Sequence, residues 1–496
     1  MLTKMLNRCS LTAIFCITFF SCTKKEYNSG ISSGIYSTDG KSITGATGSP
    51  QFGKIVENPF IKTIDSATST FSIDADGASY ATMRRWTTNN GNLSAIKEGL
   101  RTEEFINYFT YNYPDPATDA LIAVNGEVSA CPWMPDHKLI RIGIKGKSVA
   151  KQDYPYANFV LLIDVSGSMQ SPDKLELLKT GFIDFVKGMR SQDKLAIVTY
   201  AGDAGLVLDA TSGNEKDKII DKLKSLKSGG STNGAAGINL AYQIAEKNFI
   251  TAGNNRVILG TDGDFNVGVT SHDALVKLIE EKRDKGVFLT VLGVGADNLN
   301  DAMMEQVANK GNGNYEYLDN TNELKKVFID EYNKFLTVAK DVKVQVTFNP
   351  DLVEEYRLIG YENRVLQKDD FINDKKDAGE IGAGQTITAL YQIKPKQNIN
   401  YKVHPTFAIN FRYKKPAESV SNALTLDIYD EGKPFEGATE NMRFASSLAA
   451  LGLYLRSSDY RGTVSLDNIK TWAGNAKTFD PNGYRARHIE LLDKLK

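Results

Sequence analysis

The sequence predicts an α/β protein with a doubly wound, mostly parallel sheet at its centre. Near-continuous apolar runs of strand length recur between residues 158 and 318, and amphipathic helical patterns separate most of them. Strands that are buried on both faces have such unbroken runs, because helices cover both sides of a parallel sheet. A small N-terminal α+β region and a C-terminal domain that is rich in strands and ends in helices are expected to flank this centre.

The central region is expected to contain six strands. They are placed at 158–163, 194–200, 206–210, 255–260, 287–293 and 314–318. Helical patterns at 174–187 and 235–247 follow the first and precede the fourth of these strands. The run at 206–210 follows its predecessor too closely for a helical crossover, so we expect it to pair antiparallel at an edge of the sheet.

The flanking regions have the period-two alternation of exposed sheets. Strand patterns occur between 121 and 144 and again between 339 and 430, and an amphipathic helix is predicted at 440–456. The segment 70–80 passes from a strand pattern into a helix. Its acidic residues suggest a calcium loop, but Arg85 stands where the bidentate Glu would be. Helix capping and turn chemistry are therefore the favoured roles of Asp74, Asp76 and Ser79. Aromatic residues at 103–113 are interpreted as core.

Five hard oxygen donors stand in three short segments of the central region. They are Asp164, Ser166 and Ser168 in DVSGSM, Thr232 in GGSTNG and Asp262 in TDGDFN. Two carboxylates and three hydroxyls suit Mg²⁺ or Mn²⁺. The first and last groups stand where strands end, and a parallel sheet binds its ligands beyond the carboxyl ends of its strands. The alternative is that the three hydroxyls only cap helices.

These three segments resemble the three parts of the metal-ion-dependent adhesion site of the von Willebrand factor type A domain, and all five positions match. The resemblance implies that Asp164, Ser166, Ser168 and Thr232 contact the metal directly or through water. It implies that Asp262 acts mostly through water and that the sixth position is left for a partner's carboxylate. Two carboxylates roughly neutralise a dication, so net positive charge faces outward if a water holds one of them away.

The flanks extend this resemblance. The segments TSTFSIDADGASYATMRRW and EEFINYFTYNYP resemble a region that precedes the type A domain in a group of bacterial envelope proteins. The segments GAGQTITALYQI, NMRFASSLAALGLYLR and FDPNGYRARHIELL resemble the C-terminal domain of that group, whose function is unknown.

The N-terminus predicts export. Lys4 and Arg8 precede an apolar stretch at 9–20 that is too short to span a bilayer, which is typical of a secretory signal peptide. A small residue before Cys22 resembles a bacterial lipobox, although Phe19 replaces the usual Leu. We expect Cys22 to be lipidated and to anchor the protein to a membrane of the cell envelope, on its periplasmic or surface face. The alternative is an ordinary signal peptide with an incidental cysteine.

The chain is therefore divided into six segments. They are a signal peptide (1–21), a lipidated flexible tether (22–54), an N-terminal flanking region (55–152), the type A domain (153–337), a β-rich domain (338–432) and a C-terminal helical region (433–496).

Composition argues against several functions. The net charge of −1 does not suggest nucleic-acid binding, and none of the four histidines stands at metal-ligand spacing, which argues against zinc catalysis. The expected function is a non-enzymatic, membrane-anchored module that binds an acidic residue of a protein partner; its oligomeric state is left open. The alternatives are a metal-assisted hydrolase, in which Asp164 and Asp262 position a metal-bound water, and a scaffold whose metal only braces loops.

Overall fold

The structure is a computed structural model, which describes residues 52–73, 76–201, 204–231, 234–263, 272–297, 299–397, 403–416 and 418–495. The predicted signal peptide, Cys22 and Thr232 lie outside the described residues, as does most of the predicted tether. All described residues belong to one compact unit that spans Ser42–Lys496. Within them, no helix combines the length and the apolar character that crossing a membrane requires.

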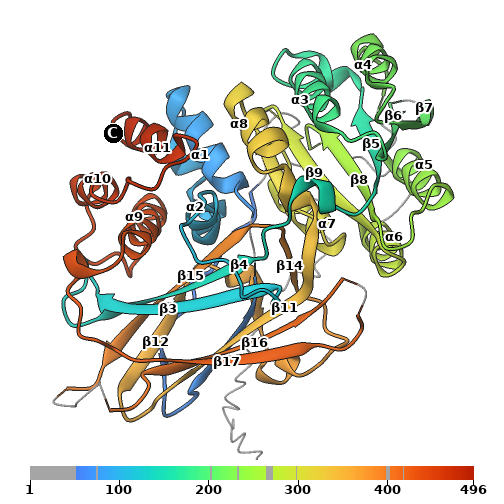
Figure 1. The fold of residues 1–496 in the computed structure, drawn as a ribbon. Helices are drawn as coiled ribbons and strands as arrows, with labels where there is room; N and C mark the ends of the chain where they lie inside the picture. The colour runs from blue at the N-terminus through green and yellow to red at the C-terminus, as the bar shows by residue number, and fades with distance from the viewer. Residues whose placement is uncertain are drawn as a thin grey trace, which may run out of the picture. The chain divides into compact units, whose positions relative to one another are not determined.

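A six-stranded sheet in the order β10-β9-β8-β5-β6-β7 forms the central region (Figure 1). Its strands are β5 (Ala157–Asp164), β6 (Lys194–Tyr200), β7 (Ala204–Ser212), β8 (Asn254–Thr261), β9 (Val287–Val294) and β10 (Tyr315–Leu318). All neighbouring strands are parallel except β6 and β7, which pair antiparallel at the edge. The predicted doubly wound, mostly parallel sheet with one antiparallel edge strand is confirmed.

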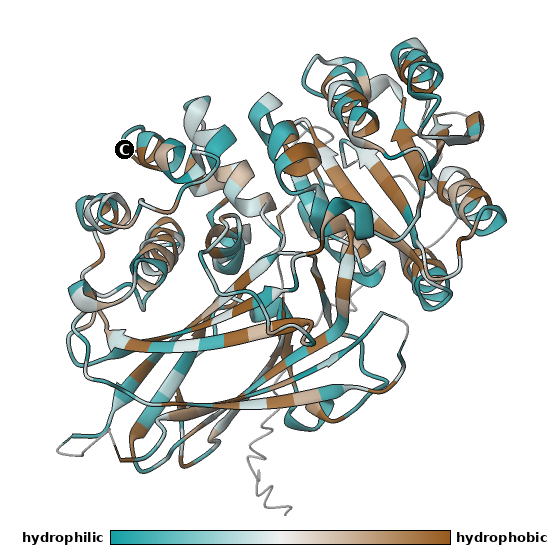
Figure 2. Ribbon diagram, in the orientation of Figure 1, coloured by the Kyte–Doolittle hydropathy of each residue, from teal (hydrophilic) through white to brown (hydrophobic). Residues whose placement is uncertain are grey.

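Helices cover both faces of this sheet. They are α3 (Leu175–Gly188), α4 (Lys216–Ser225), α5 (Gly234–Lys247), α6 (His272–Asp284), α7 (Asp301–Lys310) and α8 (Thr321–Lys325), the last continued by a π-helix (Lys326–Asp330). In β5, Val160 and Leu162 join the core under α5, α6 and α7, whereas Leu161 and Ile163 join the core under α3, α4 and α8. Both faces of β5 are therefore buried, and Figure 2 shows apolar strands beneath helices whose outer sides are largely polar.

Two further sheets form a sandwich. One has the order β1-β12-β15-β4-β3, and the other has the order β13-β2-β11-β16-β17 with β14 paired to β11. The strands that precede the central region are β1 (Ile61–Lys62), β2 (Thr68–Ser72), β3 (Ile122–Ala130) and β4 (Lys138–Gly146). Those that follow it are β11 (Thr337–Phe348), β12 (Val353–Ile359), β13 (Val365–Leu366), β14 (Gly379–Gly382), β15 (Thr386–Pro395), β16 (Phe407–Lys414) and β17 (Asn422–Ile428). Each sheet thus combines strands from the segments 55–152 and 338–432.

A helical layer covers the outer face of the first sheet. It contains α1 (Ala78–Thr88), α2 (Thr102–Asn107), α9 (Glu440–Leu455), α10 (Leu466–Gly474) and α11 (Tyr484–Leu492). Both α2 and α9 contact β15 (Figure 1). Leu139 and Leu390 point into the core beneath these helices, whereas their neighbours Ile140 and Ala389 point into the core between the two sheets. The period-two alternation of β4 and β15 therefore separates two apolar cores.

Short 3-10 turns connect the longer elements. They lie at Leu93–Ala95, Lys97–Gly99, Lys151–Asp153, Gly167–Gln170, Tyr332–Phe335, Glu362–Arg364, Lys368–Phe371 and Phe435–Gly437.

The aromatic segment at 103–113 and the acidic segment before α1 have structural roles. The predicted core role of the aromatic segment is confirmed, because its aromatic side chains are buried in the core of the helical layer. Asp76, for which helix capping and turn chemistry are expected, also makes a contact with the central sheet. Its Oδ1 accepts a hydrogen bond from the backbone N of Tyr315 at 3.0 Å, which connects the start of α1 to the edge strand β10 of the central sheet. Asp74 lies outside the described residues.

Candidate metal centre

Asp164 is the last residue of β5, in the middle of the parallel sheet, and its side chain is fully buried. Three donors fix the orientation of its carboxylate. The backbone N of Ser166 donates to Oδ1 at 2.9 Å, and the hydroxyls of Tyr200 and Thr261 donate to Oδ2 at 3.2 Å each. Tyr200 ends β6 and Thr261 ends β8, so both neighbouring strands hold Asp164 at the carboxyl edge of the sheet.

The two serines of the DVSGSM segment lie side by side after Asp164. The Oγ atoms of Ser166 and Ser168 are 3.0 Å apart. Ser166 is buried and Ser168 is exposed, so the hydroxyl pair extends from the buried carboxylate to the protein surface. Met169, which follows, is buried in the core beneath α3 and holds this turn in place.

The loop that carries Thr232 is attached to the same turn. Its Gly229 N donates to the backbone O of Val165 at 2.7 Å, and its Gly230 O accepts from the backbone N of Gly167 at 3.0 Å. Gly230 has φ of +89°, a conformation that favours glycine. Gly229 and Gly230 therefore lie against the Asp164 turn, and the structure describes the chain again from Gly234, where α5 begins. The position of Thr232 itself is outside the described residues.

Asp262 follows β8, the strand beside β5, and is also fully buried. Its Oδ2 accepts a hydrogen bond from the Nζ of Lys174 at 3.0 Å. Asp262 directly follows Thr261, whose hydroxyl donates to Asp164, so these two carboxylates, about a hundred residues apart in sequence, stand at the ends of adjacent parallel strands. The remainder of the TDGDFN segment after Gly263 is outside the described residues.

The electrostatics of the pair favour a cation. The pKa of Asp164 is raised to about 6, because burial and, to a smaller extent, the charge of Asp262 outweigh the hydrogen bonds from Ser166 and Tyr200 that lower it. Burial also raises the pKa of Tyr200 well above its usual value, together with the charge of Asp164. Two buried carboxylates that repel each other become more stable when a positive charge is placed between them.

The donor set determines which cation suits the site. Among the residues that the structure describes, no group of three or more His, Cys, Asp or Glu side chains is placed to hold a metal. The candidate site instead combines two carboxylates, Asp164 and Asp262, with the hydroxyls of Ser166 and Ser168. Such all-oxygen chemistry fits a hard dication and does not fit a soft one.

Three residues of this site were not predicted to belong to it. Lys174 stands at the start of a predicted helix, Tyr200 ends a predicted strand, and Thr261 directly follows one. Tyr200 ends the strand that register places beside Asp164, and Thr261 directly precedes Asp262, so strand-end position was the available signal for both. Lys174 has no such signal, because a lysine at the start of an amphipathic helix is usually solvent-exposed.

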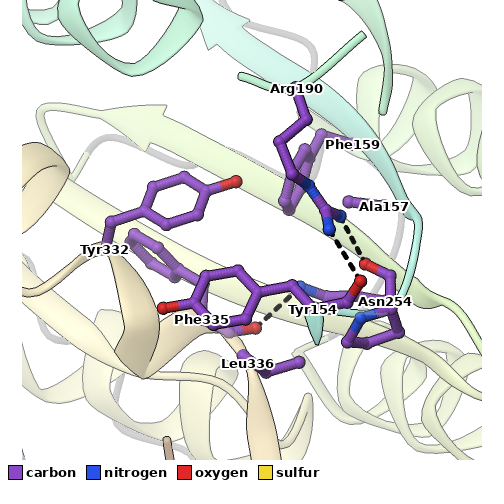
Figure 3. Close-up of a pocket in the computed structure, with 9 residues that line it drawn as sticks. Tyr154, Ala157, Phe159, Arg190, Asn254, Tyr332, Phe335 and Leu336 are labelled. Atoms are coloured by element: carbon purple, nitrogen blue, oxygen red, sulfur yellow. Dashed lines mark hydrogen bonds between the residues drawn. The ribbon is translucent and has the colours of Figure 1, made fainter. Parts of the chain in front are cut away.

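A small pocket lies at the opposite, amino-terminal edge of the same sheet (Figure 3). It is lined by Tyr154, Pro155, Ala157, Phe159, Arg190, Asn254, Tyr332, Phe335 and Leu336, and its interior has room for about one water molecule. Arg190 donates to the backbone oxygens of Tyr154 and Pro155 at 2.6 Å each and pairs with Asp193. The guanidinium thus joins the start of β5 to the end of α3, which is a structural role.

Three family models match this chain, each over a different part of it. The von Willebrand factor type A domain model matches residues 158–329, and a model described as von Willebrand factor matches 46–141. A model described as the C-terminal region of the uncharacterized protein YfbK matches 333–496. The predicted resemblance to a bacterial group with a type A domain and a C-terminal domain of unknown function is confirmed.

Relatives of the whole chain and of its centre are also found. The uncharacterized protein YfbK of Escherichia coli K12 is 39% identical over 470 residues, which are 90% of this chain and 81% of that protein. The uncharacterized protein sll0103 of Synechocystis is 25% identical over 200 residues, covering 40% of this chain and 46% of that protein. A solved von Willebrand factor type A protein from Catenulispora acidiphila is 15% identical, with 77% of this chain and 91% of that chain covered, at a TM-score of 0.45.

Proposed function

The chain belongs to the YfbK family of proteins with a von Willebrand factor type A domain, and we propose that it binds an acidic side chain of a partner protein through a divalent cation. At a general level, a type A domain is a protein-interaction module. The observation that carries the finer proposal is the convergence of Asp164 and Asp262 at one edge of the parallel sheet, next to the Ser166 and Ser168 hydroxyls.

The proposed ligands of Mg²⁺ or Mn²⁺ are Asp164, Ser166, Ser168, Thr232 and Asp262. When bound, the cation would supply a positively charged ligand position for a carboxylate from outside. The protein's own contribution is orientation. The donors on β6 and β8 keep the Asp164 carboxylate in one position, and the exposed Ser168 hydroxyl lies where a partner has access.

We further propose that this module works at the bacterial cell envelope. Cys22, at the end of the predicted signal peptide, would carry the lipid anchor. The proposed anchoring is tested by fractionating cells that express wild-type protein or the Cys22→Ala variant. Wild-type protein in the membrane fraction and Cys22→Ala protein released from it would support the anchor, and equal distributions would contradict it.

The metal-dependent function is tested with Asp164→Ala. Purified wild-type protein should melt at a higher temperature in millimolar Mg²⁺ than in EDTA. Binding to the folded state alone adds about 2.7 kcal/mol when the free ion is a hundredfold above its dissociation constant. The variant should lose this shift, and it should also fail to retain a partner from detergent-solubilised envelope that wild-type protein retains in Mg²⁺ and releases in EDTA.

Asp209→Ala is the matched control. Asp209 lies on the exposed edge strand β7 of the same sheet and pairs with Lys247 on the surface. This variant should keep both the Mg²⁺ shift and the partner. A Mg²⁺ shift that Asp164→Ala abolishes while partner retention stays unchanged would instead support the scaffold alternative. Metal-dependent turnover of ester, phosphate or peptide substrates would support the hydrolase alternative.

A further inference from the structure

Lys174 reaches the candidate metal centre from the start of α3. The residue is buried, with 3% of its surface exposed, and its Nζ lies 3.0 Å from Asp262 Oδ2. A second carboxylate, that of the exposed Asp297, lies 3.7 Å from the same Nζ. A buried ammonium is unusual, because desolvation costs several kcal/mol unless the charge is paired, so its place beside a proposed metal ligand needs a physical reason.

The backbone at the end of β9 is shaped around this lysine. Gly295 follows the strand with φ of +73°, and a Cβ built there would lie 2.3 Å from Lys174 Cε. The side chain therefore crosses directly over a residue that has no side chain of its own. The hydroxyl of Tyr317 donates to the backbone O of Gly295 at 2.7 Å and holds this crossing in place. The fold thus positions the lysine next to Asp262 and restricts its freedom to move away.

The charge balance of the site depends on this lysine. Asp164 and Asp262 contribute two negative charges, and Lys174 contributes one positive charge. With a dication these three side chains leave a net charge of about +1, whereas the two carboxylates alone would leave the site close to neutral. The nearby Asp297 carboxylate offsets only part of this charge, because 73% of its side chain is exposed and water screens it. A neutral metal site has little electrostatic preference for an anion from outside, but a site with residual positive charge does.

We infer that Lys174 is a positioning residue that pairs with Asp262 and keeps the metal-loaded site positively charged, so that the site selects a carboxylate as its outside ligand. This inference rests on the proposed function and deepens it. The lysine weakens the binding of the cation, which it repels, and strengthens the binding of the partner's anion. Its removal should therefore change these two affinities in opposite directions.

The experiment uses Lys174→Met and Lys174→Gln in the full chain, with circular dichroism as the check on folding. Mn²⁺ affinity is measured by calorimetry, without any carboxylate ligand. Affinity for an N-acetylated, C-amidated Gly-Glu-Gly peptide is then measured on Mn²⁺-loaded protein by water-proton relaxation, which detects the water that a carboxylate displaces. The equally capped Gly-Gln-Gly peptide, which has no carboxylate, is the uncharged comparison. We expect Mn²⁺ to bind on the order of tenfold more tightly, and the acidic peptide on the order of tenfold more weakly.

Lys187→Met is the matched control. Lys187 lies on the same helix, is exposed and pairs with Asp184, so this variant removes one positive charge away from the site. It should leave both affinities unchanged. If Lys174→Met does not fold, Lys174→Gln, which keeps polar reach without charge, carries the test.

The outcomes separate the two proposals. Opposite shifts in the Lys174 variants support the inference, because loss of structure alone would weaken both affinities together. Parallel or absent shifts in a folded variant overturn the role of Lys174 and leave the metal site in place. Wild-type protein that binds no Mn²⁺ overturns the proposed function itself.

Discussion

The type A region and the flanking region are assembled in different ways. All six strands of the central sheet come from one continuous stretch, Ala157–Leu318, and each parallel pair is joined through helices. Both sheets of the sandwich combine strands from before and after that stretch, so that β2 pairs with β11 and β4 pairs with β15. The type A region is therefore inserted into the flanking fold. The candidate site is built at strand ends within this one stretch, whereas the flank depends on pairings between strands on either side of it.

Buried polar contacts connect the two regions. Arg101 precedes α2 of the flank, and its guanidinium forms two hydrogen bonds with Asp301 of α7 in the type A region, at 2.6 and 3.1 Å. The same guanidinium contacts Glu305 of α7 and Glu104 of α2. All four side chains are buried. This network predicts that the two regions unfold together.

The largest expected effect comes from breaking that network. Arg101→Ala leaves three buried carboxylates without their shared cation, so the free energy of unfolding should fall by about 3–5 kcal/mol. Urea denaturation followed by circular dichroism measures the loss. The control is Lys218→Ala, which removes an exposed pair with Glu215 on the surface of the type A region and should cost about 0–1 kcal/mol.

The same experiment tests the coupling of the two regions. If they form one cooperative unit, the wild-type protein should unfold in a single transition, and Arg101→Ala should shift it or divide it into two. A loss below 1 kcal/mol in Arg101→Ala would show that the interface network contributes little to holding the regions together.

A smaller loss of stability is expected when the pH is lowered, because of a buried histidine in the flanking region. His488 on α11 is fully buried, with its Nδ1 2.9 Å from the Tyr80 hydroxyl and the rings of Phe109 and Phe444 beside it. Burial lowers the pKa of His488 to about 3, from 6.5 in the unfolded chain. Between these values the unfolded state binds more protons, so the stabilisation is present above pH 6.5 and is lost as the pH falls toward 3.

Lowering the pH from 7 to 5 should therefore reduce the free energy of unfolding by about 2 kcal/mol through this residue. In His488→Gln the stability difference between pH 7 and pH 5 should shrink by that amount, whatever the variant's stability at pH 7. His404→Gln, at an exposed histidine, should keep the wild-type difference. If His488→Gln kept the wild-type pH dependence, protonation of His488 would not be the cause of the stability lost between pH 7 and pH 5.

The contrast between the regions also explains what the sequence could predict. Every strand of the central sheet was predicted. The parallel strands leave unbroken apolar runs because both of their faces are buried, and the edge strand β7 was recognised by its short separation from β6. Asp164 and Asp262 were found because carboxylates after such runs must meet at one edge of the sheet. The pairing of strands across the insertion could not be predicted in this way. Period-two alternation of apolar and polar residues indicates which face of a strand is buried, but it does not indicate which strand pairs with it.

Contacts between side chains of elements that are far apart in sequence also could not be predicted from the sequence. Lys174 arrives over Gly295, a contact that depends on the positions of α3 and β9 in space. The contact of Asp76 with β10 could not be predicted for the same reason, because its partner there lies more than two hundred residues away. The five predicted ligands remain a prediction as a set, with Thr232 outside the described residues.

The smallest expected effect tests how tightly the type A region is packed around its site. Gly237 on α5 faces Tyr200, and a Cβ there would lie 2.7 Å from Tyr200 Cβ. Gly237→Ala should lower stability by only about 1 kcal/mol, because overpacking of about 2 kcal/mol is partly offset by the better helix propensity of alanine. Displacing Tyr200 should also disturb its hydrogen bond to Asp164 and weaken Mg²⁺ binding.

Gly188→Ala on α3 is the control. A Cβ at this position would have no neighbouring atom within 4 Å, so the variant should stabilise the protein by about 0.4–1 kcal/mol without affecting Mg²⁺ binding. Equal Mg²⁺ affinities in the two variants would show that Tyr200 does not position Asp164 for the metal.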